Sequence, residues 1–409
     1  MNLYIFNKSS YAAIFGIGTY VRELTKTLRN SEINVYMVNL KSEKTQIHIE
    51  EIDGIRHWYF PEPIQQEHLP KKSTKQDELY YRNVVYLLQL YIDDRKDLIF
   101  HLNSMDCKPL ADALKIVFDC KIVLVVHYLH SVMPLLGSIS RLSTIISQPD
   151  EPMESVETIA KRFYLREKEL THSVDKIICL SNHTFDLLRQ DYDICQEKMV
   201  VIYNGLAKTS SVYYKPELFV KYNIQSIPVI LFVGRVDNMK GITYALRAFK
   251  RVLDAMPCRL IIAGEGSFNV HMKECEDFCT YITWAGRVGK EQLYEFYSIA
   301  DIGVLPSFTE QCNYVAIEMM MHGLPMVTTS APGLAEMTED GISSLQVPVI
   351  ENDDTVEIDT ELLAEKMLYL LQNSEERKRI GANARKRYEL LYTSDIFREN
   401  MINFYQSLL

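Results

Sequence analysis

Residues 229–256 read VILFVGRVDNMKGITYALRAFKRVLDAM, and they show the repeating unit of this chain most clearly. The first five residues form a short apolar run, which is typical of a strand buried on both faces. Gly234-Arg235 then makes a turn, and Lys240-Gly241 opens an amphipathic stretch that predicts a helix over 241–256. A buried strand followed by an amphipathic helix is the unit from which parallel sheets are built.

The same alternation of strand and helix runs along the chain in two series. In the first series we expect strands at 3–6, 35–39, 98–102, 122–126, 176–180 and 200–203, and helices at 19–29, 77–95, 154–172 and 182–190. In the second we expect strands at 229–233, 259–263, 282–285, 302–305, 326–328 and 345–347, and helices at 241–256, 290–298, 314–322, 361–372, 375–392 and 394–408. The pattern predicts an α/β fold in which one parallel sheet wrapped by helices is followed by another.

A length of 409 residues favours two domains over one compact core. Asn204-Gly205 ends the first series, and the irregular stretch up to about residue 226, which contains Pro216, suits a crossing between domains. Within the first series, alternating residues flank Asp53-Gly54 and predict a type I′ hairpin.

The net charge and the apolar runs of the sequence limit which classes of binding partner are expected. The formal net charge is −10, and both halves of the chain are acidic. Binding to nucleic acid or to an anionic membrane surface requires a basic face, so neither is expected as the main partner. The longest apolar run, Ile122 to Val126, is too short to span a bilayer, so at most peripheral membrane contact is expected.

The eight cysteines are scattered, and only Cys275 and Cys279 lie close together in the sequence. One pair does not make a zinc site, and this density does not make a disulfide framework. Together with the lack of a signal-peptide pattern after Met1, reduced thiols indicate a cytoplasmic protein.

The residues that follow the second-series strands carry the chemistry. Arg235 and Lys240, with the turn at Gly234 and the helix start behind them, suit a diphosphate, although alone they could be ordinary surface cations. Glycines at 264, 266 and 286 end the next two strands, where they could admit a ligand or simply make turns.

Two carboxylates, Glu310 and Glu318, follow the strand at 302–305 at different depths, so they are not an adjacent acid–base pair. The amides of Cys312, Asn313 and Tyr314 would be donors for an anion at the start of the helix. Alternatively, Thr309 and Glu310 could merely cap that helix.

The order Gly-Arg…Lys-Gly, Gly-Glu-Gly, Ala-Gly-Arg-Val and Glu-x7-Glu…Gly-x-Pro resembles the C-terminal domain of retaining GT-B glycosyltransferases of family 4 (group 1). The likeness is most specific over about 230–347 and extends more weakly over the N-terminal half. It implies the GT-B architecture, in which two Rossmann-like domains face each other across a cleft. The implied N-terminal acceptor-side domain covers 1–206, with the helix at 394–409 crossing back to it, and the donor-binding domain covers 207–393.

The resemblance also implies roles for residues. Arg235 and Lys240 would bind the donor diphosphate, Glu318 the ribose, and Glu310 the transferred sugar. Further donor contacts are implied at Gly16, Gly18, Asn204, Gly234, Gly264, Gly266, Arg287, Val288, Cys312, Asn313 and Tyr314. Gln311-Cys312-Asn313 departs from the family's Gly-Phe-Gly, which could narrow the sugar pocket or shift donor preference.

His127 directly follows the strand at 122–126, and the family places a histidine there facing the donor sugar, so we count it with Glu310, Arg235 and Lys240 as a catalytic candidate. Ser181-Asn182 is a secondary candidate that could instead cap a helix. Near Gly16 and Gly18 a dinucleotide fingerprint would need a third glycine where Val21 stands, so a nicotinamide site is not expected.

No metal or cofactor is expected. Asp191-Tyr192-Asp193 has the Asp-x-Asp pattern of metal-dependent GT-A transferases, but it follows a helix and is better interpreted as a solvated helix end. Arg235, Lys240 and helix amides could neutralise a diphosphate without a metal.

The resemblance thus implies transfer of a hexosyl group from a nucleotide diphosphate sugar, most simply a UDP-sugar, to an acceptor hydroxyl with retention of configuration. A nucleotide-sugar-binding partner subunit and a sugar-nucleotide epimerase are the alternatives. The acceptor could be a glycan, a lipid-linked glycan, a peptide or a small metabolite, and the oligomeric state is left open.

Overall fold

The computed structural model describes residues 1–8, 16–62, 74–93, 96–148, 155–209, 213–224, 227–352 and 355–408. The chain forms two compact units. The first comprises Met1–Pro134, Leu142–Asn204 and Ser394–Leu409, and the second comprises Leu135–Arg141 and Gly205–Thr393. The division therefore falls between Asn204 and Gly205, and the short segment 135–141 groups with the second unit although it lies inside the expected N-terminal domain.

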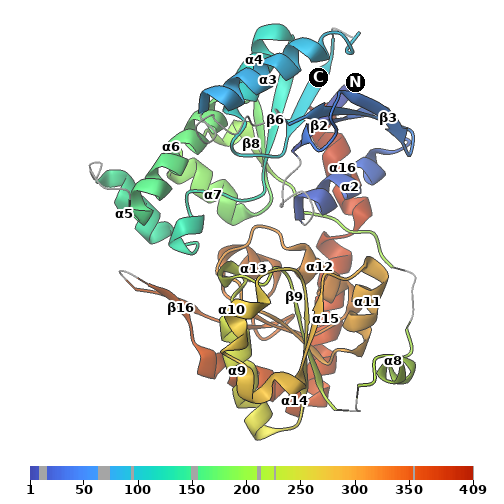
Figure 1. Ribbon diagram of the computed structural model, residues 1–409, viewed down its shortest axis with the longest axis vertical. Helices are drawn as coiled ribbons and strands as arrows, with labels where there is room; N and C mark the ends of the chain where they lie inside the picture. Colours follow the sequence, from blue (N-terminus) through green and yellow to red (C-terminus); the bar gives the residue numbers. More distant parts are fainter. Residues whose placement is uncertain are drawn as a thin grey trace. The chain divides into compact units, whose positions relative to one another are not determined.

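The elements of the first part of the chain are coloured blue to green in Figure 1. They are β1 (Asn2–Lys8), α2 (Gly16–Leu28), β2 (Asn34–Ser42), β3 (His48–Ile52), β4 (Ile55–Pro61), α3 (Thr74–Leu88), β5 (Leu98–Leu102), α4 (Lys108–Val117), β6 (Cys120–Val126), η1 (Met133–Leu135), α5 (Ile139–Ser147), α6 (Val156–Ser173), β7 (Lys176–Cys179), α7 (Asn182–Gln190), η2 (Gln196–Lys198) and β8 (Met199–Val201).

The first sheet has the strand order β3-β4-β2-β1-β5-β6-β7-β8. The pair β3–β4 is antiparallel, and β4–β2, β2–β1, β1–β5, β5–β6, β6–β7 and β7–β8 are parallel. The chain runs from β1 to β2 on one side and returns to β5 on the other. The order therefore reverses between β1 and β5, and such a switch point opens a crevice at the carboxyl ends of the strands.

The predicted hairpin is confirmed. Ile52 of β3 pairs with Ile55 of β4, and the two residues between them, Asp53 and Gly54, have φ angles of 55° and 79°. Positive φ at both central positions defines a type I′ turn, whose twist matches that of the strands it joins.

The elements of the second part are α8 (Lys215–Lys221), β9 (Val229–Val233), η3 (Asn238–Lys240), α9 (Ile242–Ala255), β10 (Arg259–Ala263), α10 (Phe268–Met272), η4 (Glu276–Tyr281), β11 (Ile282–Gly286), α11 (Lys290–Ile299), β12 (Ile302–Leu305), α12 (Tyr314–His322), β13 (Met326–Thr329), α13 (Pro332–Met337), β14 (Leu345–Val347), β15 (Val349–Glu351), β16 (Val356–Ile358), α14 (Thr360–Gln372), α15 (Ser374–Leu391) and α16 (Ser394–Gln406). Helix α8 corrects the expectation of an irregular stretch there. Pro216 stands in its first turn, where proline costs no hydrogen bond.

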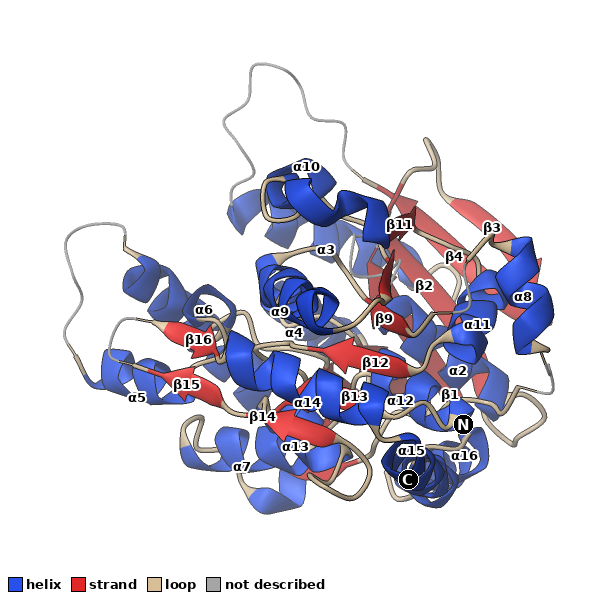
Figure 2. Ribbon diagram, turned by 90° about the horizontal axis from the view of Figure 1, so that it is seen from below, coloured by secondary structure: helices blue, strands red, loops and turns tan. Residues whose placement is uncertain are grey.

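The second sheet has the strand order β11-β10-β9-β12-β13-β14, and the neighbouring pairs are parallel. Helices α9 and α14 lie together against this sheet (Figure 2), and their apolar faces join Phe232, Ile262 and Val304 in one buried core. The chain builds β9, β10 and β11 outward in one direction and then restarts at β12 on the other side of β9. The switch point of this sheet therefore lies between β9 and β12.

The C-terminal helix α16 belongs to the first unit, where it packs beside α2. Phe397 of α16 meets the Tyr20 ring edge-on at a centroid distance of 5.8 Å. The Tyr405 hydroxyl lies 2.7 Å from Nδ1 of the fully buried His101 in β5. These contacts tie the end of the chain into the core of the first unit.

Candidate functional site

The switch point of the second sheet brings together a cation and a carboxylate from distant parts of the sequence. Lys240, at the end of η3 after β9, forms an ion pair with Glu310 from the loop after β12. Both side chains are mostly enclosed, at 22% and 10% exposure. The pair therefore lies at the edge of the sheet where α/β proteins bind ligands.

Local geometry fixes the position of Lys240. Asp237 caps η3, because its Oδ1 accepts a hydrogen bond from the Lys240 amide at 3.0 Å. The other oxygen of the same carboxylate, Oδ2, forms an ion pair with Arg235 at 3.1 Å. Gly241 follows with a φ of 67°, and a Cβ there would lie only 1.9 Å from the carbonyl oxygen of Pro306. The glycine thus lets the loop after β9 approach the loop after β12.

The loop that carries Glu310 is held from the other side by α13. A Cβ at Gly333 would lie 2.3 Å from the Glu310 carbonyl oxygen and 2.4 Å from that of Gln311. Such a close backbone approach is possible only for glycine. The placement of Glu310 therefore depends on the start of α13 as well as on its pair with Lys240.

The start of helix α12 differs from both arrangements expected from the sequence, free backbone amides or a cap formed by Thr309 and Glu310. Asn313 is the N-cap, and its side chain accepts a hydrogen bond from the Ala316 amide at 3.1 Å, so Thr309 and Glu310 do not cap the helix. The Asn313 amide was expected to be available to an anion, but it donates to Sδ of Met337 at 3.1 Å. An anion would have to displace this weak acceptor.

Glu318 lies in α12 with 8% of its surface exposed. The hydroxyl of Tyr297, from α11, donates to its Oε2 at 2.8 Å. Burial and this carboxylate together raise the pKa of Tyr297 well above its usual value, so the phenol keeps its proton and acts as a donor. The Glu318 carboxylate is therefore oriented by a neighbouring helix.

The glycines that follow β9 and β10 pack against one another. A Cβ on Gly264 would lie 1.7 Å from the Gly234 carbonyl oxygen, and one on Gly266 would lie 2.4 Å from that of Val236. The structure thus gives these glycines a packing reason, and their contact with a donor stays a prediction. Arg287 is exposed and Val288 half-buried just after β11.

In the first unit, His127 directly follows β6. Its Nε2 lies 2.9 Å from Oδ1 of Asn103, and the Tyr20 ring packs edge-on against it at 4.7 Å. Because the Asn103 amide nitrogen donates to the Phe6 carbonyl, Oδ1 is left to accept, and Nε2 carries the proton. Burial, with a smaller effect of His101, lowers the pKa of His127 to about 3, so the imidazole is neutral at physiological pH.

The remaining first-unit candidates have structural roles or sit at element ends. Ser181 caps α7 by accepting from the Thr184 amide at 3.2 Å, and Asn204 is buried after β8. Gly16 is exposed at the first position of α2, and Gly18 is half-buried in its first turn. Residues 9–15, which precede them, lie outside the described residues.

The Asp-x-Asp triplet is a helix end, as expected. Asp191 is the C-cap of α7, and Asp193 pairs with Lys168. Tyr192 between them is fully buried and donates to Glu167 Oε2 at 2.9 Å. Within the described ranges, no three His, Cys, Asp or Glu side chains gather as a metal site, and no helix is long and apolar enough to cross a membrane.

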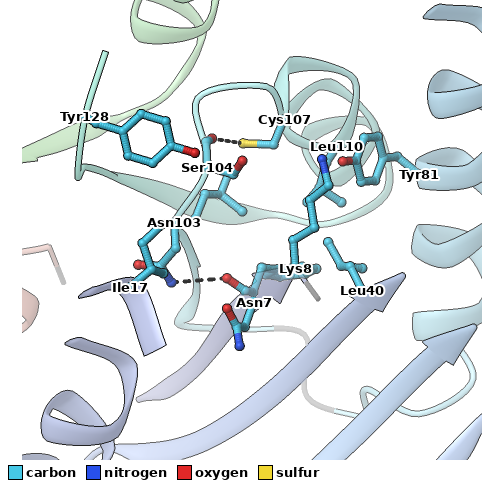
Figure 3. Close-up of a pocket in the computed structure, with 12 residues that line it drawn as sticks. Asn7, Lys8, Ile17, Leu40, Tyr81, Asn103, Ser104, Cys107, Leu110 and Tyr128 are labelled. Atoms are coloured by element: carbon cyan, nitrogen blue, oxygen red, sulfur yellow. Dashed lines mark hydrogen bonds between the residues drawn. The ribbon is translucent and has the colours of Figure 1, made fainter. Parts of the chain in front are cut away.

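A pocket at the switch point of the first sheet was not predicted from the sequence. Its wall includes Phe6–Lys8 at the end of β1, Leu102–Ser104 at the end of β5, and Tyr128 (Figure 3). Asn7 and Lys8 at the end of a predicted strand could have pointed to this pocket. However, the sequence alone does not show that the sheet reverses its order beside that strand.

Two family descriptions match the two parts of the chain. The family description "Glycosyltransferase Family 4" matches residues 14–208, and "Glycosyl transferases group 1" matches residues 227–373. An uncharacterized glycosyltransferase from Methanocaldococcus jannaschii is 26% identical over 60% of this chain and 64% of its own length. The alpha-D-kanosaminyltransferase of Streptomyces kanamyceticus is 24% identical over 62% of this chain and 65% of its own. These matches thus span just under two thirds of the relatives' lengths.

Solved structures match over the full chain. Sucrose-phosphate synthase from Thermosynechococcus elongatus has a TM-score of 0.78 at 20% identity and covers 100% of this chain and 99% of its own. Anabaena HepE, solved in complex with UDP and glucose, has a TM-score of 0.74 at 16% identity with complete coverage of both chains. The expected fold class is confirmed: the chain has the GT-B fold, and it is built from a glycosyltransferase family 4 domain followed by a group 1 glycosyltransferase domain.

Proposed function

We propose that this protein is a retaining hexosyltransferase that moves a sugar from a UDP-sugar to an acceptor hydroxyl. The observation that carries the proposal is the Lys240–Glu310 pair at the switch point of the second sheet, with Arg235 on the same loop as Lys240. A cation and a carboxylate side by side suit a ligand that has a diphosphate next to a polyhydroxylated ring.

The chemistry requires charge stabilisation. The bond between the anomeric carbon and the diphosphate oxygen breaks, a bond from that carbon to the acceptor oxygen forms, and the acceptor proton passes to the leaving phosphate oxygen. Negative charge grows on the diphosphate, where Lys240 and Arg235 would stabilise it. Positive charge grows on the sugar ring, where Glu310 would stabilise it.

The present ion pairs suit this role. Lys240 holds Glu310 and Arg235 holds Asp237, so both cations are kept in place before a donor arrives. A diphosphate carries more charge than one carboxylate and can draw both cations to itself. Glu310 would then turn to the hydroxyls of the sugar, and Glu318 would accept from the ribose. His127 is retained as a proposed catalytic residue.

No metal is required in this proposal, because two cations would face the diphosphate. We therefore expect transfer to continue in the presence of EDTA. Loss of activity with EDTA and its recovery with Mg²⁺ or Mn²⁺ would overturn this part of the proposal.

The donor class can be identified by a thermal-shift panel of UDP, GDP and ADP, each with and without its hexose. A ligand at 100 times its Kd stabilises the folded state by about 2.7 kcal/mol. We expect UDP and UDP-hexoses to raise the unfolding midpoint, and a larger rise with GDP or ADP would reassign the nucleotide.

The two alternatives differ in their products. A partner subunit would bind a UDP-sugar without releasing UDP, and an epimerase would return a different sugar still attached to UDP. The proposed transferase instead releases UDP, slowly with water and faster once a suitable acceptor is added. The relatives' names include a D-inositol 3-phosphate glycosyltransferase and a lipopolysaccharide 1,2-N-acetylglucosaminetransferase, so the comparisons leave the acceptor class open.

A further inference from the structure

A fully buried histidine of the first unit has no part in the proposed function. His101, in β5, has two ring nitrogens that face tyrosine hydroxyls from different helices. The hydroxyl of Tyr405, from α16, lies 2.7 Å from Nδ1, and that of Tyr20, from α2, lies 3.4 Å from Nε2. One imidazole therefore connects α16 to α2.

The protonation state of His101 determines the direction of these hydrogen bonds. Burial lowers its pKa to about 3, against a smaller opposing effect of Asn103, so the ring is neutral at neutral pH. A neutral imidazole has one N–H donor and one acceptor nitrogen. Because the contact with Tyr405 is the shorter one, and burial raises the pKa of this phenol so that it keeps its proton, we assign Nδ1 as the acceptor. Nε2 then carries the ring proton and faces Tyr20 as a donor.

The ring of Tyr20 is enclosed by aromatic neighbours from several elements. It is fully buried, it stacks on His101 at a centroid distance of 5.9 Å, and Phe397 of α16 meets it edge-on at 5.8 Å. The ring of His127 packs edge-on against it at 4.7 Å. Because closely packed side chains transmit displacements to their neighbours, the position of Tyr20 constrains the ring of His127.

A hydrogen bond holds His127 as well. Its Nε2 lies 2.9 Å from Oδ1 of Asn103, which follows β5, and β5 pairs in parallel with β6, which His127 follows. This bond fixes one nitrogen of the ring, and the edge-on contact with Tyr20 limits rotation of the ring about it. The orientation of His127 therefore depends on Tyr20 and, through His101, on α16.

We propose that Tyr405 is a positioning residue for His127 and that it acts through His101 and Tyr20. The contacts involved lie within the first unit, to which α16 belongs. The inference rests on the proposed function for the catalytic role of His127, whereas the positioning rests on the contacts themselves. If Tyr405 only stabilised the fold, its hydroxyl could be removed without any change in the His127 ring or in the rate of transfer.

Imidazole NMR of the full-length protein with isotope-labelled histidine tests the positioning. Tyr405→Phe removes the hydroxyl and keeps the aromatic ring. The variants His101→Gln and His127→Gln assign the two sets of signals. We expect Tyr405→Phe to move the signals of both imidazoles and to change the balance between the two tautomers of His101. Signals of His127 that stay in place in the folded variant would overturn the proposal.

Kinetics of UDP release from UDP-glucose test the consequence for catalysis. A misplacement of about 1 Å in an active site can lower a rate by about 100-fold, so we expect Tyr405→Phe to lower kcat by about 10-fold. The KM for UDP-glucose should stay within about twofold of the wild-type value, because the substitution removes no group that is proposed to bind the donor. An unchanged kcat would overturn the proposal.

Tyr164→Phe is the matched control. Tyr164 is a buried tyrosine of the same unit, and its hydroxyl donates to the Asp191 carbonyl at 2.7 Å, a contact as short as that of Tyr405. Each variant loses one buried hydrogen bond, so both should show a lower midpoint in urea unfolding. Only Tyr405→Phe should also lower kcat and move the His127 signals. An equal fall of kcat in the two variants would show that Tyr405 acts through stability alone.

Phe397→Leu changes the same ring by a different contact. It removes the edge-on contact of α16 with Tyr20 and leaves the hydroxyls beside His101 in place. We expect it to move the His127 signals and to lower kcat, as in Tyr405→Phe, with little change in the tautomers of His101. Unchanged His127 signals in both variants would exclude α16 as the positioning element.

The measurements separate this inference from the proposed function. If the wild type releases no UDP but Tyr405→Phe moves the His127 signals, the positioning stands and the transferase proposal falls. If Tyr405→Phe releases UDP at the wild-type rate, the inference is wrong, whether or not the signals move, and the transferase proposal stands.

Discussion

Lys240 and Glu310, separated by 70 residues in the sequence, form an ion pair between the loops after β9 and β12. The two strands are neighbours in the sheet although they are the first and fourth of its series. The pair therefore results from the strand order, and it places opposite charges where a nucleotide sugar would carry a diphosphate next to a hexose.

Lys240→Ala should abolish most of the transfer. Loss of one preorganised group that stabilises developing negative charge typically lowers kcat by about 10²–10³-fold. We expect a similar fall in kcat/KM and a weaker thermal shift with UDP. Lys250→Ala is the control, because Lys250 pairs with Asp254 on the outer face of α9. A Lys240→Ala enzyme as active as the control would exclude Lys240 from the site.

Tyr297→Phe should weaken both folding and donor binding. The substitution leaves the 8%-exposed Glu318 without the hydroxyl that donates to it at 2.8 Å. Loss of a hydrogen bond to a buried charged group costs about 1–3 kcal/mol of unfolding free energy. We also expect a several-fold rise in the KM for the donor with little change in kcat, measured beside Tyr281→Phe at an exposed tyrosine. An unchanged KM would argue against ribose binding by Glu318.

Gly333→Ala should damage the site from a distance. The new methyl group would lie 2.3 Å from the Glu310 carbonyl oxygen, so the loop must move. Forcing an extra group into a packed region typically costs about 1–3 kcal/mol. We expect a lower midpoint in urea unfolding and a clear loss of kcat. Gly289→Ala, where a Cβ meets nothing within 4 Å, is the control: it changes only the N-cap of α11 and should leave kcat near that of the wild type.

Stability should fall as the pH drops below about 6.5, because His101 is fully buried and burial lowers its pKa to about 3. The unfolded chain, with an ordinary histidine pKa, takes up the proton first, so stability is complete above that value and is lost towards pH 3. Between pH 6.5 and 5 this one group should cost about 1–2 kcal/mol.

Urea unfolding of the wild type and His101→Gln across that range measures the effect. The variant should be less stable at pH 7, where it lacks the bonds to Tyr20 and Tyr405, but its stability should depend less on pH. His48→Gln, at a more exposed site in β3, is the control for loss of a histidine side chain outside the core. Equal slopes for wild type and His101→Gln would contradict the assignment.

Much of the fold could be predicted from the sequence. The strands at 98–102, 229–233, 259–263, 302–305 and 345–347 have the predicted bounds, because each short run is bounded on at least one side by glycine, proline or a charged residue. Helices α4, α5, α8, α10 and α13 were not predicted. Three of them, α4, α8 and α13, have proline in the first turn, a residue that marks a boundary in the sequence but is accepted at a helix start.

Only part of the candidate site could be predicted from the sequence. Lys240 and Glu310 could be chosen as strand-end residues, but their pairing depends on the sheet order, which periodicity does not give. The roles of Gly241 and Gly333 depend on backbone contacts with Pro306 and Glu310 that no local pattern encodes. The pocket beside Lys8 was missed for the same reason, because β1 and β5 are neighbours only after folding.

We propose that the Lys240–Glu310 site splits a UDP-sugar with retention of configuration. Proton NMR of the purified protein with a UDP-α-hexose and an excess of acceptor follows UDP release and the anomeric signal of the first product. We expect UDP release that depends on Lys240 and Glu310, and a new α-glycoside as the initial product. Release of UDP with a β-product, or a UDP-sugar that stays intact with every acceptor, would contradict it.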